Sequence, residues 1–128
     1  MDELLASSLR QIAETIRSKR VSAKQVTVAF LDRINTVNPA LNAVIASNAE
    51  AALKQAERAD IALSGGETPG KLFGVPMTIK DSLDTFDMTT TWGTVGRKDF
   101  RPSRDATCVA RLRLSLIHIS EPTSPLYI

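Results

Sequence analysis

The stretch from Phe73 to Asp84, Phe-Gly-Val-Pro-Met-Thr-Ile-Lys-Asp-Ser-Leu-Asp, decides how the chain can fold. Apolar side chains alternate along it with more polar ones, which is the period-two pattern of a β-strand. The apolar positions are Val75, Met77 and Ile79. Gly74 and Pro76 mark the start of the predicted strand, because proline cannot donate to a sheet and belongs at the first residues of a strand or on an edge. The pattern therefore places Lys80 at the far end of the polar face.

Lys80 has two interpretations at that position. If the fold covers the polar face, a buried ammonium group is costly, and the neutral amine becomes available as a general base. If the face stays open, Lys80 is solvated and loosely paired with Asp81, a surface ion pair that contributes at most about 1 kcal/mol. Spacing alone favours the solvated interpretation, because lysines are mostly exposed.

The residues before this stretch predict three helices. In the first, apolar residues recur at helical spacing at Leu5, Leu9, Ile12 and Ile16. Ser22 and Gln25 form a candidate capping box that opens the second helix, and Pro39 closes it. The apolar face of the second helix consists of Val26, Phe30, Ile34 and Val37. One-sided helices of this kind normally face their own core.

The segment between the second and third helices predicts a short strand at residues 41–46. Ser47 and Glu50 form another candidate capping box, which opens an alanine-rich third helix through Leu63. Residues 64–70 are a linker to the lysine strand. The length suits one domain, and no internal repeat is evident.

Short motifs follow one another in order between Leu5 and Arg113. They are Val21-Ser22-Ala23; Asn38-Pro39-Ala40-Leu41-Asn42-Ala43-Val44; Gly74-Val75-Pro76 with Ile79-Lys80-Asp81; Asp84-Thr85; Thr90-Thr91-Trp92-Gly93-Thr94; and Asp105-Ala106-Thr107 leading into Val109-Ala110-Arg111-Leu112. Each is weak alone, but their order and spacing together resemble the N-terminal part of the amidase signature family. Its members are serine hydrolases that cleave carboxamides with a Ser-Ser-Lys triad.

The resemblance implies an α/β fold in which helices pack on a mixed sheet, with residues 1–113 as the N-terminal part of an amidase domain and most of the sheet missing. Lys80 takes the position of the family's catalytic lysine, which activates a nucleophilic serine through a second serine. Both serines come from a later glycine- and serine-rich segment, and none of the six glycines here lies in such a run. The implied enzyme hydrolyses a carboxamide to a carboxylate and ammonia or an amine through an acyl-serine, with no metal or organic cofactor. We expect this chain by itself to be inactive.

Three departures from the family pattern bear on these expectations. Asp87 stands where the family often has glycine after the lysine strand, and aspartate tolerates a left-handed backbone better than most residues. Phe73 stands where relatives commonly carry histidine, and leaves the lysine in place. Ser82 follows Asp81 where the A subunits of tRNA-dependent amidotransferases, which share this catalytic core, tend to have asparagine. Membership of that branch is therefore the second functional hypothesis, and a non-enzymatic helical interaction fragment is the third.

The C-terminal end departs most from the family. Residues 114–123, Leu-Ser-Leu-Ile-His-Ile-Ser-Glu-Pro-Thr, resemble a translated sequencing adaptor. We interpret residues 114–128 as a non-native tail, to be left out of fold reasoning. His118, the only histidine, lies inside this tail and receives no role.

Composition and charge exclude several classes of partner. The net charge is only +2 and no basic stripe is interleaved with aromatic residues, so we expect no nucleic acid partner and a solvated loop at the basic residues 97–104. No apolar run reaches the roughly 20 residues of a membrane span, and the first residues carry acid where a signal peptide carries base. We therefore expect a cytoplasmic protein without a membrane partner, whose full-length form binds a small-molecule amide.

Cys108 is the only cysteine, so it has no internal disulfide partner, and one cysteine with one histidine supplies no metal site. On a helix that begins near Asp105, it lies four residues before Leu112 and is predicted to be a buried, small apolar side chain.

The predicted strands create a physical problem. Two short strands do not form the sheet that the helices should cover, and a lone pair of strands is marginal in water. We therefore expect exposed apolar stripes and a molten or aggregation-prone product.

Overall fold

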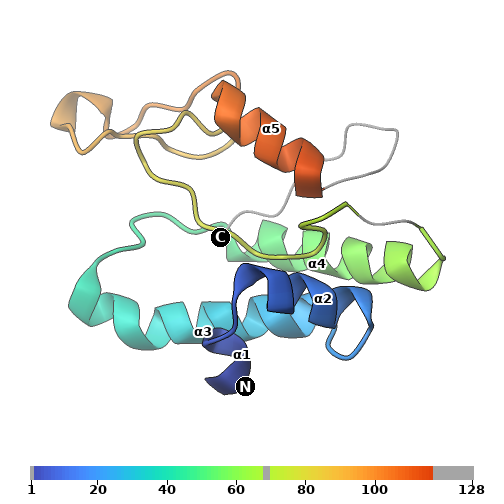
Figure 1. Ribbon diagram of the computed structural model, residues 1–128. Helices are drawn as coiled ribbons and strands as arrows, with labels where there is room; N and C mark the ends of the chain where they lie inside the picture. Colours follow the sequence, from blue (N-terminus) through green and yellow to red (C-terminus); the bar gives the residue numbers. More distant parts are fainter. Residues whose placement is uncertain (1, 68–69, 117–128) are drawn as a thin grey trace.

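The computed structural model describes residues 2–67 and 70–116. Its elements are α1 (Asp2–Leu5), α2 (Leu9–Arg17), α3 (Ala23–Leu41), α4 (Ala49–Ser64), the short 3₁₀ helix η1 (Val95–Arg97) and α5 (Thr107–Leu116). Figure 1 shows α1 to α4 on one side of the molecule, and α5 with the irregular segment that leads to it on the other. None of the described residues is in a β-strand.

The first predicted helix is divided into α1 and α2, so the prediction of a single element is wrong. Ser8 begins α2: its hydroxyl accepts a hydrogen bond from Gln11 N (3.3 Å), and Gln11 Oε1 accepts one from Ser8 N (2.8 Å). This reciprocal capping box satisfies two backbone donors at the point where the chain changes direction. Ile12 and Ile16 remain buried, whereas Leu9 is 51% exposed.

The start of α3 is confirmed and has a second anchor. Ser22 and Gln25 form the predicted capping box. The carboxylate of Asp60, on α4, also accepts hydrogen bonds from Ala23 N (2.7 Å) and Lys24 N (3.1 Å). A negative charge is favourable at a helix N-terminus, where backbone N–H groups lack partners. Asp60 therefore joins the start of α3 to α4.

The end of α3 corrects two predictions. Pro39 lies inside the last turn, where it removes only one helical hydrogen bond, and the helix continues to Leu41. The predicted strand at 41–46 is absent because Leu41 is helical and residues 42–48 are irregular. Asn38 supplies both hydrogen bonds that a neighbouring strand would give Val44: its Nδ2 donates to Val44 O and its Oδ1 accepts from Val44 N, each at 2.8 Å.

The third predicted helix is present as α4, but its cap is different. Asn48, and not Ser47, is the residue that begins it, because Asn48 Oδ1 accepts a hydrogen bond from Ala51 N (3.3 Å). The capping box predicted from Ser47 and Glu50 is therefore wrong. Both serine and asparagine are good N-caps, so the sequence offered two adjacent candidates.

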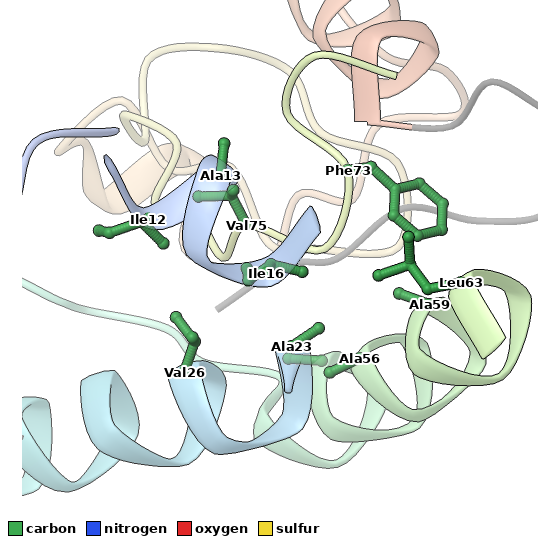
Figure 2. Packing of buried hydrophobic residues seen from close by; sticks show 11 residues of the cluster. Ile12, Ala13, Ile16, Ala23, Val26, Ala56, Ala59, Leu63, Phe73 and Val75 are labelled. Atoms are coloured by element: carbon green, nitrogen blue, oxygen red, sulfur yellow. The ribbon is translucent and has the colours of Figure 1, made fainter. Parts of the chain in front are cut away.

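The core lies between α2, α3 and α4, and residues 73–75 pack against it (Figure 2). Its buried members are Ile12, Ala13, Ile16, Ala23, Val26, Ala52, Ala56, Ala59, Leu63, Phe73 and Val75. Five of these eleven are alanines, which let helix backbones approach closely but bury little apolar area each. Gly74 has a φ of +73° and lies where a Cβ would come within 2.9 Å of Ala23 Cβ and 3.3 Å of Ile16 Cγ2.

The predicted lysine strand is not a strand here, although its pattern of burial survives. Val75 is buried and Met77 and Ile79 are half-buried, while Thr78 and Lys80 are exposed. A strand exists only where it pairs with a neighbour, and no part of the described chain pairs with residues 75–80. The alternation in burial is therefore present although no described strand pairs with these residues.

Several large apolar side chains of the described residues are exposed, as the incomplete sheet predicts. They are Leu9, Val28, Leu41, Ile45, Ile61, Phe86, Trp92, Val95, Phe100, Leu112 and Leu114. The molten or aggregation-prone product stays a prediction. Among the helices of residues 2–67 and 70–116, none combines the length and apolarity needed to cross a membrane.

Candidate active site

Lys80 lines a cleft with a volume of about 570 Å³. The cleft is bounded by residues 43–46, which connect α3 to α4, and by residues 78–81 and 88–90 with Leu83 and Thr85. Apolar side chains from the connection therefore share the cleft with hydroxyl groups and with the ammonium group of Lys80. This combination suits a small organic molecule that carries a few polar groups.

The backbone of Lys80 is held in a turn. Leu83 N donates a hydrogen bond to Lys80 O at 2.9 Å, which closes a four-residue turn over Asp81 and Ser82. The ammonium group is exposed, and within the described residues it makes no hydrogen bond or ion pair. Of the solvated interpretation, the exposure of Lys80 is confirmed, whereas the loose pairing with Asp81 is wrong.

The carboxylate of Asp81 contacts a second turn. It accepts hydrogen bonds from Thr91 N (2.7 Å), from the Thr91 hydroxyl and from Gly93 N (3.3 Å). The Thr91 hydroxyl, followed by these backbone donors, holds the pKa of Asp81 below its ordinary value against the opposing effect of desolvation. Asp81 is thus an ionised link between two segments ten residues apart.

The second turn has an unusual backbone. Trp92 and Gly93 both have positive φ, at 55° and 69°, and Thr94 N donates to Thr91 O at 3.0 Å. Positive φ at both central residues is typical of type I′ turns, which favour glycine and asparagine. A tryptophan at the first of these positions is strained. Successive N–H groups in such a turn form a concave site for an anion, and here Asp81 fills it.

Arg97 supports the turn from outside. Its guanidinium lies 4.2 Å from the centroid of the Trp92 ring and 3.8 Å from that of Phe100. It also pairs with Asp84 at 3.3 Å, and its Nε donates to Thr90 O at 3.4 Å. The prediction of a solvated loop at 97–104 therefore fails for Arg97, which is only 27% exposed in its side chain.

Replacing Arg97 by lysine should loosen this turn. Lysine keeps the charge but loses the planar group that stacks on two rings, so we expect the local stability to fall by about 1–2 kcal/mol. Trp92 is the only tryptophan, and its fluorescence reports on this turn alone. Quenching by acrylamide should rise in Arg97→Lys and stay unchanged in the control Arg101→Lys, whose side chain is exposed. Equal quenching in both variants would contradict the stacking.

Asp105 attaches α5 to the site. Its carboxylate accepts hydrogen bonds from Phe86 N (2.8 Å) and forms a largely buried ion pair with Arg113 (2.6 Å), both side chains being 13% exposed. Ala106 N donates to Asp84 O at 2.7 Å. Between these contacts the chain turns at Asp87, whose φ of 65° confirms the predicted left-handed position.

The prediction that Cys108 is buried is wrong, because its side chain is exposed. Val109, one residue later, is fully buried. A helix of ten residues has no sequence signal that distinguishes these two registers when alanine, valine and leucine occur on several faces. Cys108 and Leu112 therefore share an outward face.

The predicted boundary at 113 falls inside α5, which continues to Leu116. The rest of the predicted tail, residues 117–128 with His118, lies outside the described residues. No three histidine, cysteine, aspartate or glutamate side chains within residues 2–67 and 70–116 are placed to hold a metal ion.

The chain matches one protein-family model and is similar in sequence to several known proteins. The Amidase family model matches residues 25–119. The chain is 42% identical over 113 residues to the A subunit of the glutamyl-tRNA(Gln) amidotransferase of Bdellovibrio bacteriovorus, a match that covers 88% of this chain and 23% of that protein. It is 38% identical over 112 residues to the putative amidase AmiD of Mycobacterium tuberculosis, covering 88% and 24% respectively.

Solved structures agree with these sequence matches. The peptide amidase of Stenotrophomonas maltophilia superposes with a TM-score of 0.76 at 32% identity, over 84% of this chain and 22% of that one. The chain therefore spans about a quarter of the length of the relatives it matches. Its helices are an N-terminal fragment of the α/β amidase signature fold, as the sequence motifs predicted. The chain belongs to the Amidase family.

Proposed function

We propose that this chain is the N-terminal part of an amidase and that Lys80 is the base of its catalytic triad. The observation that carries the proposal is the placement of Lys80. Its ammonium group has no partner among the described residues, it lines the cleft, and its backbone is fixed by two turns. A lysine that is held in place and yet unpaired remains available for proton exchange with a group from another segment.

The reaction would need two serines from the part of the amidase that follows this segment. Neutral Lys80 would take a proton from the first serine, which in turn would take one from the nucleophilic serine as that oxygen attacks the carboxamide carbon. The proton would return to the departing nitrogen, so that ammonia or an amine leaves and an acyl-serine remains. Water would then release the carboxylate and restore the serine. No metal or organic cofactor takes part in this proposal, and the cytoplasm is the proposed location.

A chimaera tests the proposal without relying on the activity of a fragment. Residues 1–113 would replace the equivalent N-terminal segment of the Stenotrophomonas maltophilia peptide amidase, whose fold they share. We expect the chimaera to release ammonia from an amide that the host cleaves, within about a hundredfold of the host rate, because a misplacement of about 1 Å costs about 10²-fold. The 128-residue chain alone is the control and should release none.

A chimaera that has the host's circular dichroism and melting temperature but no activity would contradict the proposal. Amidase activity in the 128-residue chain alone would contradict the proposal that the nucleophilic serine comes from the part of the amidase that follows this segment.

A second candidate is the A subunit of a tRNA-dependent amidotransferase. The 42% identity to such a protein favours it, whereas Ser82 after the Lys-Asp pair favours a free amidase. The genomic neighbourhood separates them: genes for the other amidotransferase subunits beside the locus would support the amidotransferase, and their absence together with an active chimaera would support the amidase.

A further inference from the structure

Lys80 lies at the point where two turns meet. The first turn is closed by the hydrogen bond from Leu83 N to Lys80 O. The second is the Thr91–Thr94 turn, and the side chain that joins them belongs to Asp81, the residue next to the lysine. Asp81 therefore connects the second turn directly to the backbone beside Lys80.

The connection between the two turns consists of several hydrogen bonds to the carboxylate of Asp81. Thr91 contributes both its N–H and its hydroxyl, and Gly93 contributes its N–H. The Thr91 hydroxyl also accepts a hydrogen bond from Gly93 N at 3.0 Å, so the donors hold one another in place. Hydrogen bonds to an ionised group are stronger than those between neutral groups, and they act on a turn in which Trp92 has a positive φ.

Further contacts fix the Thr91–Thr94 turn to the rest of the molecule. Thr90 N donates to Phe100 O at 3.0 Å, and Arg97 links Thr90 O to the carboxylate of Asp84. No strand of the described chain pairs with residues 75–80, so these hydrogen bonds and the Arg97–Asp84 ion pair hold the end of the lysine segment in place.

We propose that Asp81 is a positioning residue for Lys80: by filling the anion site of the Thr91–Gly93 turn, its carboxylate fixes the backbone from which the lysine reaches the cleft. The proposal rests on the proposed function of Lys80 as the triad base. Asp81 does not act as the charge partner of the lysine, because its oxygens accept from Thr91 and Gly93. Its effect on the reaction passes through geometry.

The first test uses the 128-residue chain and its single tryptophan, which lies between the two residues that bind Asp81. The pKa of Asp81 is lowered in the folded chain, so its contribution is present above its ordinary value and is lost as the pH falls through the lower one. Trp92 fluorescence should therefore change at a pH below about 3.9, the ordinary value for aspartate, while far-UV circular dichroism of the helices stays constant.

Asp81→Asn should remove this fluorescence transition, and hydrogen exchange read by mass spectrometry should show lost protection at residues 88–96 with none lost in α3 or α4. Asp99→Asn is the matched control and should keep the transition, because Asp99 is an exposed carboxylate of the same irregular segment and makes no hydrogen bond or ion pair within the described residues. Thr91→Ser keeps the hydroxyl group and should show the same fluorescence transition and hydrogen-exchange protection as the parent chain. Thr91→Val lacks the hydroxyl group and should lose both. Full protection in Asp81→Asn would overturn the proposal.

The second test uses the chimaera. Asp81→Asn should lower kcat by about tenfold to a hundredfold and leave KM within about twofold, because a displaced base slows the chemical step without weakening substrate binding. An Asp81→Asn chimaera with the parent kcat, beside an inactive Lys80→Ala chimaera, would overturn the positioning role and leave the proposed function intact. An active Lys80→Ala chimaera would instead overturn the proposed function.

Discussion

Gly74→Ala should lower the free energy of unfolding by about 3 kcal/mol. Gly74 has a φ of +73°, a conformation that costs a residue with a Cβ about 1–2 kcal/mol. The added Cβ would also stand 2.9 Å from Ala23 Cβ and 3.3 Å from Ile16 Cγ2. Neither neighbour is the far end of a flexible side chain, so the Gly74 backbone or one of the helices α2 and α3 must shift, and overpacking of this kind costs about 1–3 kcal/mol.

Alanine substitutions at two other glycines distinguish the cost of the positive φ from the cost of the steric overlap. Gly93 also has a positive φ, 69°, but a Cβ there would meet nothing within 4 Å, so Gly93→Ala should cost only the backbone share, about 1–2 kcal/mol. Gly96 has neither feature, and Gly96→Ala should be close to neutral. Urea unfolding followed by far-UV circular dichroism compares the three variants. A Gly74→Ala loss no larger than that of Gly93→Ala would show that the helices tolerate the methyl group.

The helices could be predicted from the sequence because their signals are local. The Ser22 and Gln25 capping box is confirmed because both partners lie within one turn and satisfy each other regardless of the rest of the fold. Ser8 and Gln11 carry the same signal, but the apolar spacing continues across it and hides the break between α1 and α2. Asp60, which caps α3 from another helix, has no local signal at all.

The strands could not be predicted in the same way, because a strand depends on a partner. The alternation along Val75, Met77 and Ile79 is present in the burial of these side chains, yet no sheet forms around them in the described part of the chain. The relatives are about four times as long as this chain, and the extra length is where partner strands can come from.

The candidate site is only partly visible in the sequence. Lys80 stands out by its position after the Gly-Val-Pro motif, whereas the roles of Asp81 and Arg97 have no such signal. The adjacency of Asp81 to the lysine suggests a charge pair, although its partners are ten and twelve residues away. Arg97 lies in a basic stretch whose other members are exposed, and only the folded turn shows that two aromatic rings enclose it.

Lys80→Ala in the chimaera should lower kcat by about a thousandfold, because general base catalysis contributes roughly 10²–10⁴-fold and members of a triad act as a unit. Lys80 is exposed in the described residues, so its removal leaves no cavity within this segment. A melting temperature equal to that of the parent chimaera would show that the loss of kcat comes from the chemical step. Lys80→Arg should be equally inactive, since a guanidinium stays protonated and cannot accept the serine proton.

Lys71→Ala is the matched control for this substitution. Lys71 is an exposed lysine nine positions earlier, in the turn that leads into Gly74, and it does not line the Lys80 cleft. Its removal takes away the same charge and should leave kcat within about twofold, as expected of a surface substitution away from the site. Equal losses in Lys71→Ala and Lys80→Ala would mean that net positive charge near the cleft is what matters. A selective loss in Lys80→Ala and Lys80→Arg, with Lys71→Ala unchanged, would support the amine of Lys80 as the base of the Ser-Ser-Lys proposal.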